Sequence, residues 1–176
     1  MIRHGEKPPA GLGQLDCKGL NRSLALPALL IGRFGKPDYI YAPNPSVQVS
    51  DHSSSGYSYI RPLATIEPTA IRLGMPVDAQ IGYNQVDLLE KDLLQPAYAH
   101  SLIFVAWEHV KLHDFAVNLV KEYGAGEDHV PDWPGSDFDT IYIFHITRSG
   151  PNNTPQVRLE IQHEGLNNSL SDTCPN

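Results

Sequence analysis

The stretch Ser101-Leu102-Ile103-Phe104-Val105-Ala106-Trp107 decides how the rest of the sequence is interpreted. After its serine the stretch is wholly apolar, and a run without alternating polar residues is typical of a central strand that is buried on both faces. Residues 111–123 follow with apolar side chains at helical spacing and end before a glycine, so they predict an amphipathic helix. A buried strand followed by such a helix is the unit from which parallel sheets are built.

The same alternation of strand-like and helical patterns extends along the chain in both directions. Further strands are predicted at residues 38–42, 76–80, 138–147 and 156–163, and further helices at residues 16–33, 62–73 and 87–95. Residues 150–153 favour a hairpin between the last two strands, while Pro27 and Pro68 predict kinks or breaks in their helices. This order predicts one α/β domain over residues 1–176, a three-layer sandwich with a mainly parallel central sheet, and a tail at residues 164–176 without a core of its own.

Composition limits the classes of function. The chain has 176 residues, of which 41% are hydrophobic and 19% charged, and this is the composition of a globular protein. Its formal net charge of -7 argues against general binding to nucleic acid or to an anionic membrane surface, because both present negative charge. No apolar stretch approaches the roughly 20 residues that a membrane-spanning helix needs. A small anionic substrate remains compatible, provided that basic residues converge in one cleft.

Three short motifs lie where this fold would bring them together. Arg3-His4-Gly5 follows the residues that we expect in the first strand, Arg61-Pro62 opens a predicted helix, and Glu108-His109 follows the central apolar run. Ligands of α/β folds bind at the carboxyl ends of the strands, so the first and third motifs are expected at one site. A neutral imidazole can attack phosphorus, and planar guanidinium groups match phosphate oxygens in pairs. The motifs therefore predict phosphoryl chemistry.

Together with Glu6, these motifs resemble those of the histidine phosphatase superfamily, whose members include phosphoglycerate mutases and acid phosphatases. The resemblance implies a phosphoglycerate mutase-like fold. It assigns the nucleophile to His4, which would form a phosphohistidine, and it assigns phosphate binding to Arg3, Arg61 and His109. It implies a metal-independent phosphomonoester hydrolase that needs no cofactor and acts on a small phosphorylated substrate.

The proton donor for the leaving group is not determined by these motifs. In the superfamily a glycine or an aspartate commonly follows the second histidine, whereas this chain has Val110 after His109. Glu108 is the favoured donor because it lies next to His109. The alternatives are Glu6, Asp87 and Glu90.

Two other functions stay open: a mutase that moves the phosphoryl group within one substrate, and a non-catalytic module that binds a phosphorylated ligand. The substrate and the oligomeric state are left open as well, since specificity is expected to depend on the loop at residues 43–59 and on residues 81–90. His109 and His113 are four residues apart, but because His109 is expected to end a strand, a metal-binding pair on a helix is not predicted.

The ends of the chain carry two further expectations. The superfamily motif follows a strand of several residues, but only Met1 and Ile2 precede it here, so we expect the first strand to be truncated. Cys17 and Cys174 are either unrelated thiols or one disulfide that ties the tail to the first helical region. The protein is then cytoplasmic or, if the disulfide forms and an export signal has been lost, periplasmic or secreted.

Overall fold

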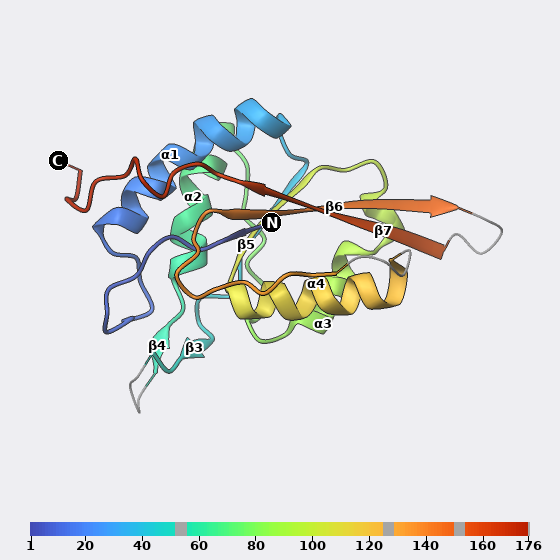
Figure 1. Ribbon diagram of the computed structural model, residues 1–176, viewed down its shortest axis with the longest axis horizontal. Helices are drawn as coiled ribbons and strands as arrows, with labels where there is room; N and C mark the ends of the chain where they lie inside the picture. Colours follow the sequence, from blue (N-terminus) through green and yellow to red (C-terminus); the bar gives the residue numbers. More distant parts are fainter. Residues whose placement is uncertain (52–55, 125–128, 150–153, 176) are drawn as a thin grey trace.

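The computed structural model describes residues 1–51, 56–124, 129–149 and 154–175, and shows helices on both sides of a five-stranded sheet (Figure 1). The order across the sheet is β2-β5-β1-β6-β7, so the predicted central strand has neighbours on both sides. The strands are β1 (Ile2–Arg3), β2 (Tyr39–Tyr41), β5 (Ile103–Trp107), β6 (Thr140–Ser149) and β7 (Thr154–His163). The α/β class predicted from the sequence is confirmed.

The sheet is mixed in strand direction. β2, β5 and β1 run parallel to one another, whereas β6 pairs antiparallel with β1 and β7 pairs antiparallel with β6. The antiparallel part is the hairpin predicted near the end of the chain. Thr140 lies opposite His163 at one end of the hairpin, and Ser149 lies opposite Thr154 at the other. The spacer at residues 150–153 lies outside the described residues.

In the part of the chain that the structure describes, four helices flank the sheet: α1 (Cys17–Phe34), α2 (Arg61–Leu73), α3 (Val86–Leu93) and α4 (His109–Tyr123). A short 3-10 turn, η1, covers Pro96–Tyr98. Neighbouring residues of β5 serve two different apolar cores. Phe104 packs with residues of α1 and α2, whereas Val105 packs with residues of α3 and α4. Because successive side chains of a strand point to opposite faces, β5 is buried on both faces, as its apolar sequence predicts.

Neither helix is broken at its internal proline. Helix α1 continues through Pro27 and helix α2 through Pro68. The two helices pack against each other and against the sheet in a shared apolar core, and burial of that face outweighs the local cost of the missing backbone donor. A break at Pro27 is therefore excluded, whereas the kinks expected at Pro27 and Pro68 stay predictions.

Three element boundaries differ from the sequence-based expectation. Helix α4 begins at His109, not at Lys111, because Glu108 caps it. The loop predicted at residues 43–59 contains a short antiparallel pair, β3 (Gln48–Val49) with β4 (Tyr57–Ser58). The strand expected at residues 76–80 is reduced to one bridge, between Tyr41 and Asp78.

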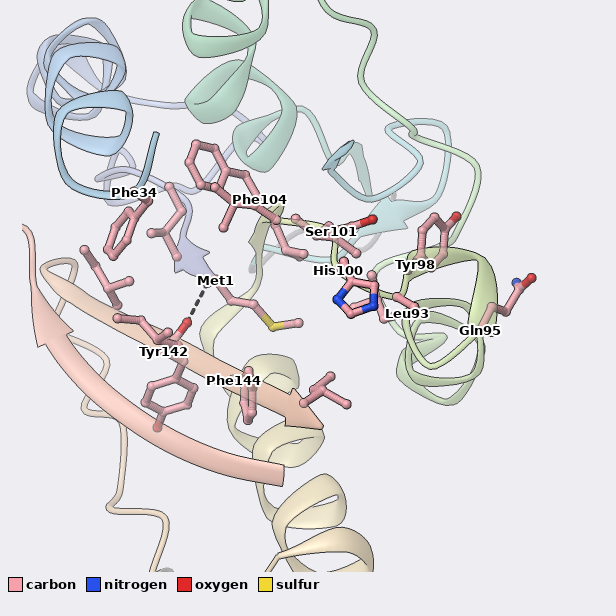
Figure 2. A pocket seen from close by; sticks show the side chains of 18 of the residues that line it. Met1, Phe34, Leu93, Gln95, Tyr98, His100, Ser101, Phe104, Tyr142 and Phe144 are labelled. Carbon is pink, nitrogen blue, oxygen red and sulfur yellow. Dashed lines mark hydrogen bonds between the residues drawn. The ribbon is translucent and has the colours of Figure 1, made fainter. Parts of the chain in front are cut away.

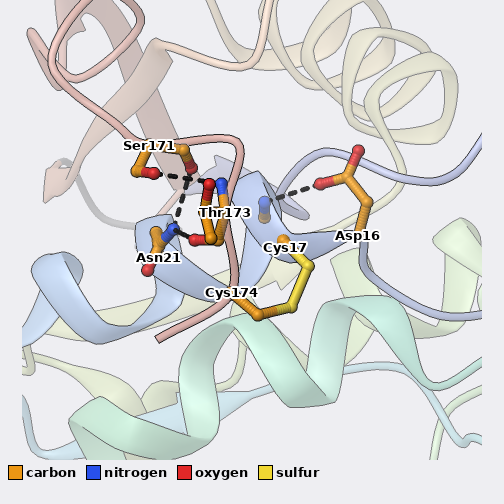
Figure 3. The surroundings of a disulfide bond; sticks show 7 residues. Asp16, Cys17, Asn21, Ser171, Thr173 and Cys174 are labelled. Carbon is orange, nitrogen blue, oxygen red and sulfur yellow. Dashed lines mark hydrogen bonds between the residues drawn. A yellow bond between two sulfur atoms is a disulfide. The ribbon is translucent and has the colours of Figure 1, made fainter. Parts of the chain in front are cut away.

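The C-terminal residues lie along α1 and are fastened to it. A disulfide joins Cys17 to Cys174, and the side-chain amide of Asn21 donates to the carbonyl oxygens of Ser171 and Thr173, each at 2.8 Å (Figure 3). Of the two interpretations of the cysteines, the structure therefore has the disulfide. Among the helices of the described residues, none combines the length and apolarity needed to cross a membrane.

Candidate active site

The carboxyl ends of β1 and β5 bring the predicted site residues together. These strands are parallel neighbours, with Arg3 opposite Trp107, so the residues that follow them, His4 and Glu108, emerge at one edge of the sheet. Helix α2 begins beside them because the hydroxyl of Thr65 accepts a hydrogen bond from the Gly5 amide at 2.9 Å. The charges of Arg61, Arg3 and Glu108 all act on the His4 imidazole, in line with the expectation of one site.

His4 is held as a neutral imidazole with a defined tautomer. Its ring is buried, and its Nδ1 lies 2.7 Å from the carbonyl oxygen of Gly5. Since a carbonyl oxygen can only accept a hydrogen bond, Nδ1 carries the proton and Nε2 carries the lone pair. Burial, together with the nearby charges of Arg61 and Arg3, lowers the pKa of His4 from 6.5 to about 3. The side chain therefore has the form that a histidine nucleophile needs.

Arg3 is a buried cation with unused hydrogen-bonding capacity. Its Nη1 donates to the carbonyl oxygens of Gly135 and Asp137, both at 2.8 Å, and its guanidinium carbon lies 3.7 Å from the centre of the Phe138 ring. Its Nε is buried and has no hydrogen-bond partner. Burial lowers the pKa of Arg3 to about 10, which leaves the side chain charged at neutral pH.

Arg61, the second arginine whose charge acts on His4, is paired with a carboxylate. Its two terminal nitrogens donate to the two oxygens of Asp51, one of them at 3.1 Å, and its guanidinium lies over the ring of Tyr59. Burial acts to raise the pKa of Asp51, but the hydrogen bonds from Arg61 and the Gly13 amide, together with the charges of Arg61 and Lys7, lower that pKa overall. As in Arg3, the Nε of Arg61 is buried without a partner.

Glu108 and His109 form the third part of the site. A side-chain oxygen of Glu108 accepts from the backbone amide of Lys111 at 2.9 Å and so caps α4, while its other oxygen lies 2.6 Å from Nδ1 of His109. Burial raises the pKa of Glu108, but hydrogen bonds from His109 and from the start of the helix lower it further, to about 2. A Cβ on Gly135 would lie 3.9 Å from Nε2 of His109, so the segment that binds Arg3 also borders His109.

Gly5 matters for its lack of a side chain. It is absent from the glycines with positive φ in the described residues, so no left-handed backbone conformation requires glycine here. A Cβ at this position would lie only 2.9 Å from the backbone of Gly19 in α1. Gly5 is therefore required for the close approach of the loop to this helix.

The alternative proton donors lie elsewhere. Glu6 makes two hydrogen bonds to the buried Arg22, at 2.8 and 2.9 Å, and is part of a separate ionic cluster. Asp87 and Glu90 line a surface pocket between α3 and α4. Among the four carboxylates considered from the sequence, Glu108 is the one whose charge acts on His4.

Three contributors were missed in the sequence. Phe138 was expected to start a strand, the carbonyl of Asp137 belongs to a polar loop, and Asp51 belongs to the long loop at residues 43–59. No sequence motif marks these residues, because each reaches the site only through contacts that form in the folded protein. His109 and His113 do share helix α4, contrary to expectation, yet the described residues contain no group of three or more histidine, cysteine or acidic side chains arranged to hold a metal ion.

Comparison of the sequence with models of known protein families gives no match, and comparison with curated proteins gives none either.

Proposed function

We propose that the protein is a metal-independent phosphomonoester hydrolase of the histidine phosphatase type, with a phosphoglycerate mutase-like three-layer fold. The observation that carries this proposal is the buried, neutral His4, on which the charges of two arginines act. Its Nδ1 is occupied by the Gly5 carbonyl, so Nε2 is left as the nucleophile. Arg3 and Arg61 each keep a buried, unpartnered Nε, and unused cationic donors beside a nucleophile are what an anionic phosphoryl group requires.

The reaction proceeds in two displacements. The non-bridging phosphate oxygens are bound by Arg3, Arg61 and His109, and Nε2 of His4 attacks phosphorus. The new P–N bond forms as the P–O bond to the alcohol breaks, and the electron pair of that bond leaves with the alcohol oxygen, which takes a proton. Water then attacks the phosphohistidine, the P–N bond breaks, and inorganic phosphate leaves with His4 restored to its neutral form.

Glu108 is the proposed proton donor for the alcohol. With a pKa of about 2 it is ionised in the free protein, whereas a general acid must carry a proton. A phosphate anion bound beside it raises the pKa of this carboxyl group, because a like charge disfavours ionisation. The proton is therefore taken up as the substrate binds, and Glu108 then delivers it to the leaving oxygen.

Arg61 changes partners when substrate arrives. Asp51 holds both of its terminal nitrogens in the free protein, and Lys7 lies 3.8 Å from the same carboxylate. A phosphoryl group reaches Arg61 either at its free Nε or by displacing Asp51, whose charge is then balanced by Lys7. Asp51 thus keeps the buried guanidinium oriented and neutralised until the phosphate replaces it.

Binding of a phosphorylated ligand without turnover is the second candidate. It is favoured by the strongly acidic Glu108, because a carboxylate that stays ionised in the complex provides no proton to a leaving alcohol. The two functions share Arg3, Arg61 and His109 as the phosphate-binding groups and differ in the protonation of Glu108.

The disulfide supports a location in an oxidising compartment such as the periplasm or the cell exterior. Disulfides persist there, whereas cytosolic thiols are kept reduced. The proposed partner is a small phosphorylated substrate, and the net charge of -7 argues against nucleic acid.

Hydrolysis of aryl phosphates tests the proposal. We expect turnover by the native chain that is insensitive to chelator, is lost in His4→Ala and is retained in His113→Ala, a half-buried control elsewhere on α4. Glu108→Gln should slow esters with a poor alkoxide leaving group far more than nitrophenyl phosphate, whose leaving group needs no proton. A folded native chain that binds phosphate but hydrolyses none of these esters would favour the binding function.

A further inference from the structure

Tyr59 is a buried side chain beside His4 that the proposed reaction does not use. It lies between β4 and α2, and its ring is almost perpendicular to the His4 ring, with 6.0 Å between the ring centres. The ring of Tyr83 packs against it at 4.9 Å, and the guanidinium carbon of Arg61 lies 4.7 Å from its centre. These contacts hold the ring in place, so its hydroxyl group has a defined position at the site.

The hydroxyl group of Tyr59 has no hydrogen-bond partner within residues 1–51, 56–124, 129–149 and 154–175. The two other tyrosines that are buried to a similar degree both use theirs. The Tyr41 hydroxyl donates to Asp92 at 2.8 Å, and the Tyr142 hydroxyl donates to the Pro131 carbonyl at 3.4 Å. Because buried polar groups are nearly always paired, the exception at Tyr59 calls for a function.

The charged groups around this hydroxyl are those of the proposed site. Besides burial, the charges of Arg61 and Glu108 act on the pKa of Tyr59, and Tyr59 in turn acts on the pKa of Arg3. A guanidinium group can only donate, so neither arginine can accept the hydroxyl hydrogen. What the hydroxyl needs is an acceptor, and the two guanidinium groups favour an acceptor with negative charge. A phosphoryl oxygen has both properties.

Tyr59 keeps its proton while it serves the site. Burial raises the pKa of its hydroxyl group, and the charge of Arg61 only partly opposes this effect. A phenol with a raised pKa still donates a hydrogen bond, but it releases its proton less readily than an ordinary phenol. The hydroxyl is therefore suited to binding an anion, whereas protonation of the leaving alcohol remains the proposed role of Glu108.

We propose that the Tyr59 hydroxyl is a further phosphate-binding group of this site, which donates a hydrogen bond to a non-bridging oxygen of the phosphoryl group. This inference rests on the proposed function, and it adds a neutral donor to the cationic groups of Arg3 and Arg61. The cost of burying an unpaired hydroxyl is met when the chain folds and is recovered when the anion binds. Stability is thus exchanged for binding at this position.

Tyr59→Phe tests the role of the hydroxyl alone, because phenylalanine keeps the ring that packs on His4 and Arg61. Since the hydroxyl is unpaired in the free protein, we expect the Tm of this variant to stay the same or to rise. A lost hydrogen bond to a charged group should lower kcat/KM for an aryl phosphate by roughly tenfold to a hundredfold. A purely structural role would leave kcat/KM unchanged.

Tyr41→Phe is the matched control. Its hydroxyl is paired, with Asp92 at 2.8 Å and with the Tyr98 hydroxyl at 2.6 Å. Figure 2 shows Tyr98 at a cavity of about 650 Å³ that is lined by the first residues of β5, away from the carboxyl end where Glu108 lies. We expect Tyr41→Phe to lower the Tm and to keep the native kcat/KM, the reverse of the result for Tyr59→Phe.

The leaving group separates the role of Tyr59 from that of Glu108. A hydrogen bond to a non-bridging oxygen assists every ester, so Tyr59→Phe should slow nitrophenyl phosphate and an alkyl phosphate by the same factor. Glu108→Gln should slow the alkyl ester far more. Inorganic phosphate is a second probe that needs no turnover. Its Kd, measured by isothermal titration calorimetry, should be roughly tenfold higher in Tyr59→Phe and unchanged in Tyr41→Phe.

The outcomes distinguish this inference from the proposed function. Native kcat/KM and native phosphate affinity in Tyr59→Phe, together with loss of turnover in His4→Ala, would overturn the role of Tyr59 and leave the hydrolase in place. A lower Tm with an equal loss of activity in both phenylalanine variants would also overturn it. Phosphate binding that is weaker in Tyr59→Phe, without turnover by the native chain, would support the hydroxyl contact and refute the hydrolase. A folded native chain that neither binds phosphate nor hydrolyses esters would refute both.

Discussion

Nδ1 of His4 lies 2.7 Å from the carbonyl oxygen of Gly5, and this one hydrogen bond assigns the proton of the imidazole. The amide of Gly5 in turn donates to Thr65, whose hydroxyl donates to the Arg61 carbonyl. The proposed nucleophile and one of its two arginines are thus connected through two residues. The positions of His4 and Arg61 therefore depend on the close approach of Gly5 to helices α1 and α2.

Substitution of Gly5 tests this dependence on close packing. A Cβ in Gly5→Ala would lie 2.9 Å from the backbone of Gly19, so either the loop or α1 must move. We expect a loss of about 1–3 kcal/mol in the free energy of unfolding, as for other overpacked sites. Gly32→Ala is the matched control, because its Cβ would meet no atom within 4 Å and alanine favours the helix. Urea denaturation measures both, and equal stability of the two variants would contradict the packing argument.

Phe138 is predicted to support Arg3 through its ring. Phe138→Leu keeps an apolar side chain but removes the aromatic face, which lies 3.7 Å from the guanidinium carbon. A cation–π contact of about 1 kcal/mol corresponds to a decrease of roughly fivefold in kcat/KM for an aryl phosphate. Phe34→Leu, whose ring packs on Phe104 away from the site, should leave kcat/KM unchanged. An equal decrease in both variants would point to a general loss of stability.

Glu164 is predicted to make the stability of the protein decrease as the pH rises through neutrality. Burial raises the pKa of this carboxyl from 4.5 to about 7, against the opposing effect of Arg22. The folded protein then binds more protons than the unfolded chain between these values. The contribution of Glu164 is complete below about pH 4.5 and is lost as the pH passes 7.

Glu164→Gln should remove this part of the pH dependence, which is on the order of a few kcal/mol. Urea denaturation of the native chain and the variant between pH 4 and 8 measures the difference. Glu160→Gln is the control: this carboxylate of β7 is half-buried and its pKa is lowered by Gln162 and His145, so the variant should keep the decrease in stability near pH 7. If the free energy of unfolding changed with pH in the same way for the native chain and for Glu164→Gln, Glu164 would not be the source of this pH dependence.

Reduction of the disulfide should destabilise the chain and release its C-terminal residues. Cys17 and Cys174 are separated by 157 positions, and cross-linking so distant a pair destabilises the unfolded chain by about 5 kcal/mol on a chain-entropy basis. Thermal unfolding with and without reductant measures the effect, and limited proteolysis should show cleavage first in the segment that packs on α1. The Cys17→Ser, Cys174→Ser double variant should behave as the reduced protein and no longer respond to reductant.

Features set by local burial could be predicted from the sequence. The uninterrupted apolar run before Trp107 indicated a strand buried on both faces, and the alternating runs on each side of residues 150–153 indicated the hairpin. Arg3 and His4 were placed correctly beside Glu108, because parallel neighbouring strands end at the same edge of a sheet.

Features set by tertiary contacts could not be predicted. Pro27 was expected to interrupt α1, yet packing against α2 keeps the helix continuous. His109 was expected to end a strand because it comes directly after the apolar run, but Glu108 caps α4 and His109 is the first residue of that helix. Asp51 and Phe138 reach the arginines across the fold, and no local pattern marks them.

The most direct test of the central claim is to trap the phosphorylated protein. The native chain is mixed with an aryl phosphate and quenched in alkali, which preserves phosphohistidine, and its peptides are analysed by mass spectrometry. We predict one added phosphoryl group on the peptide that contains His4, no such group in His4→Ala, and no change when chelator is present. Turnover of the ester without any phosphorylated His4, or with the group on another residue, would contradict the proposed mechanism.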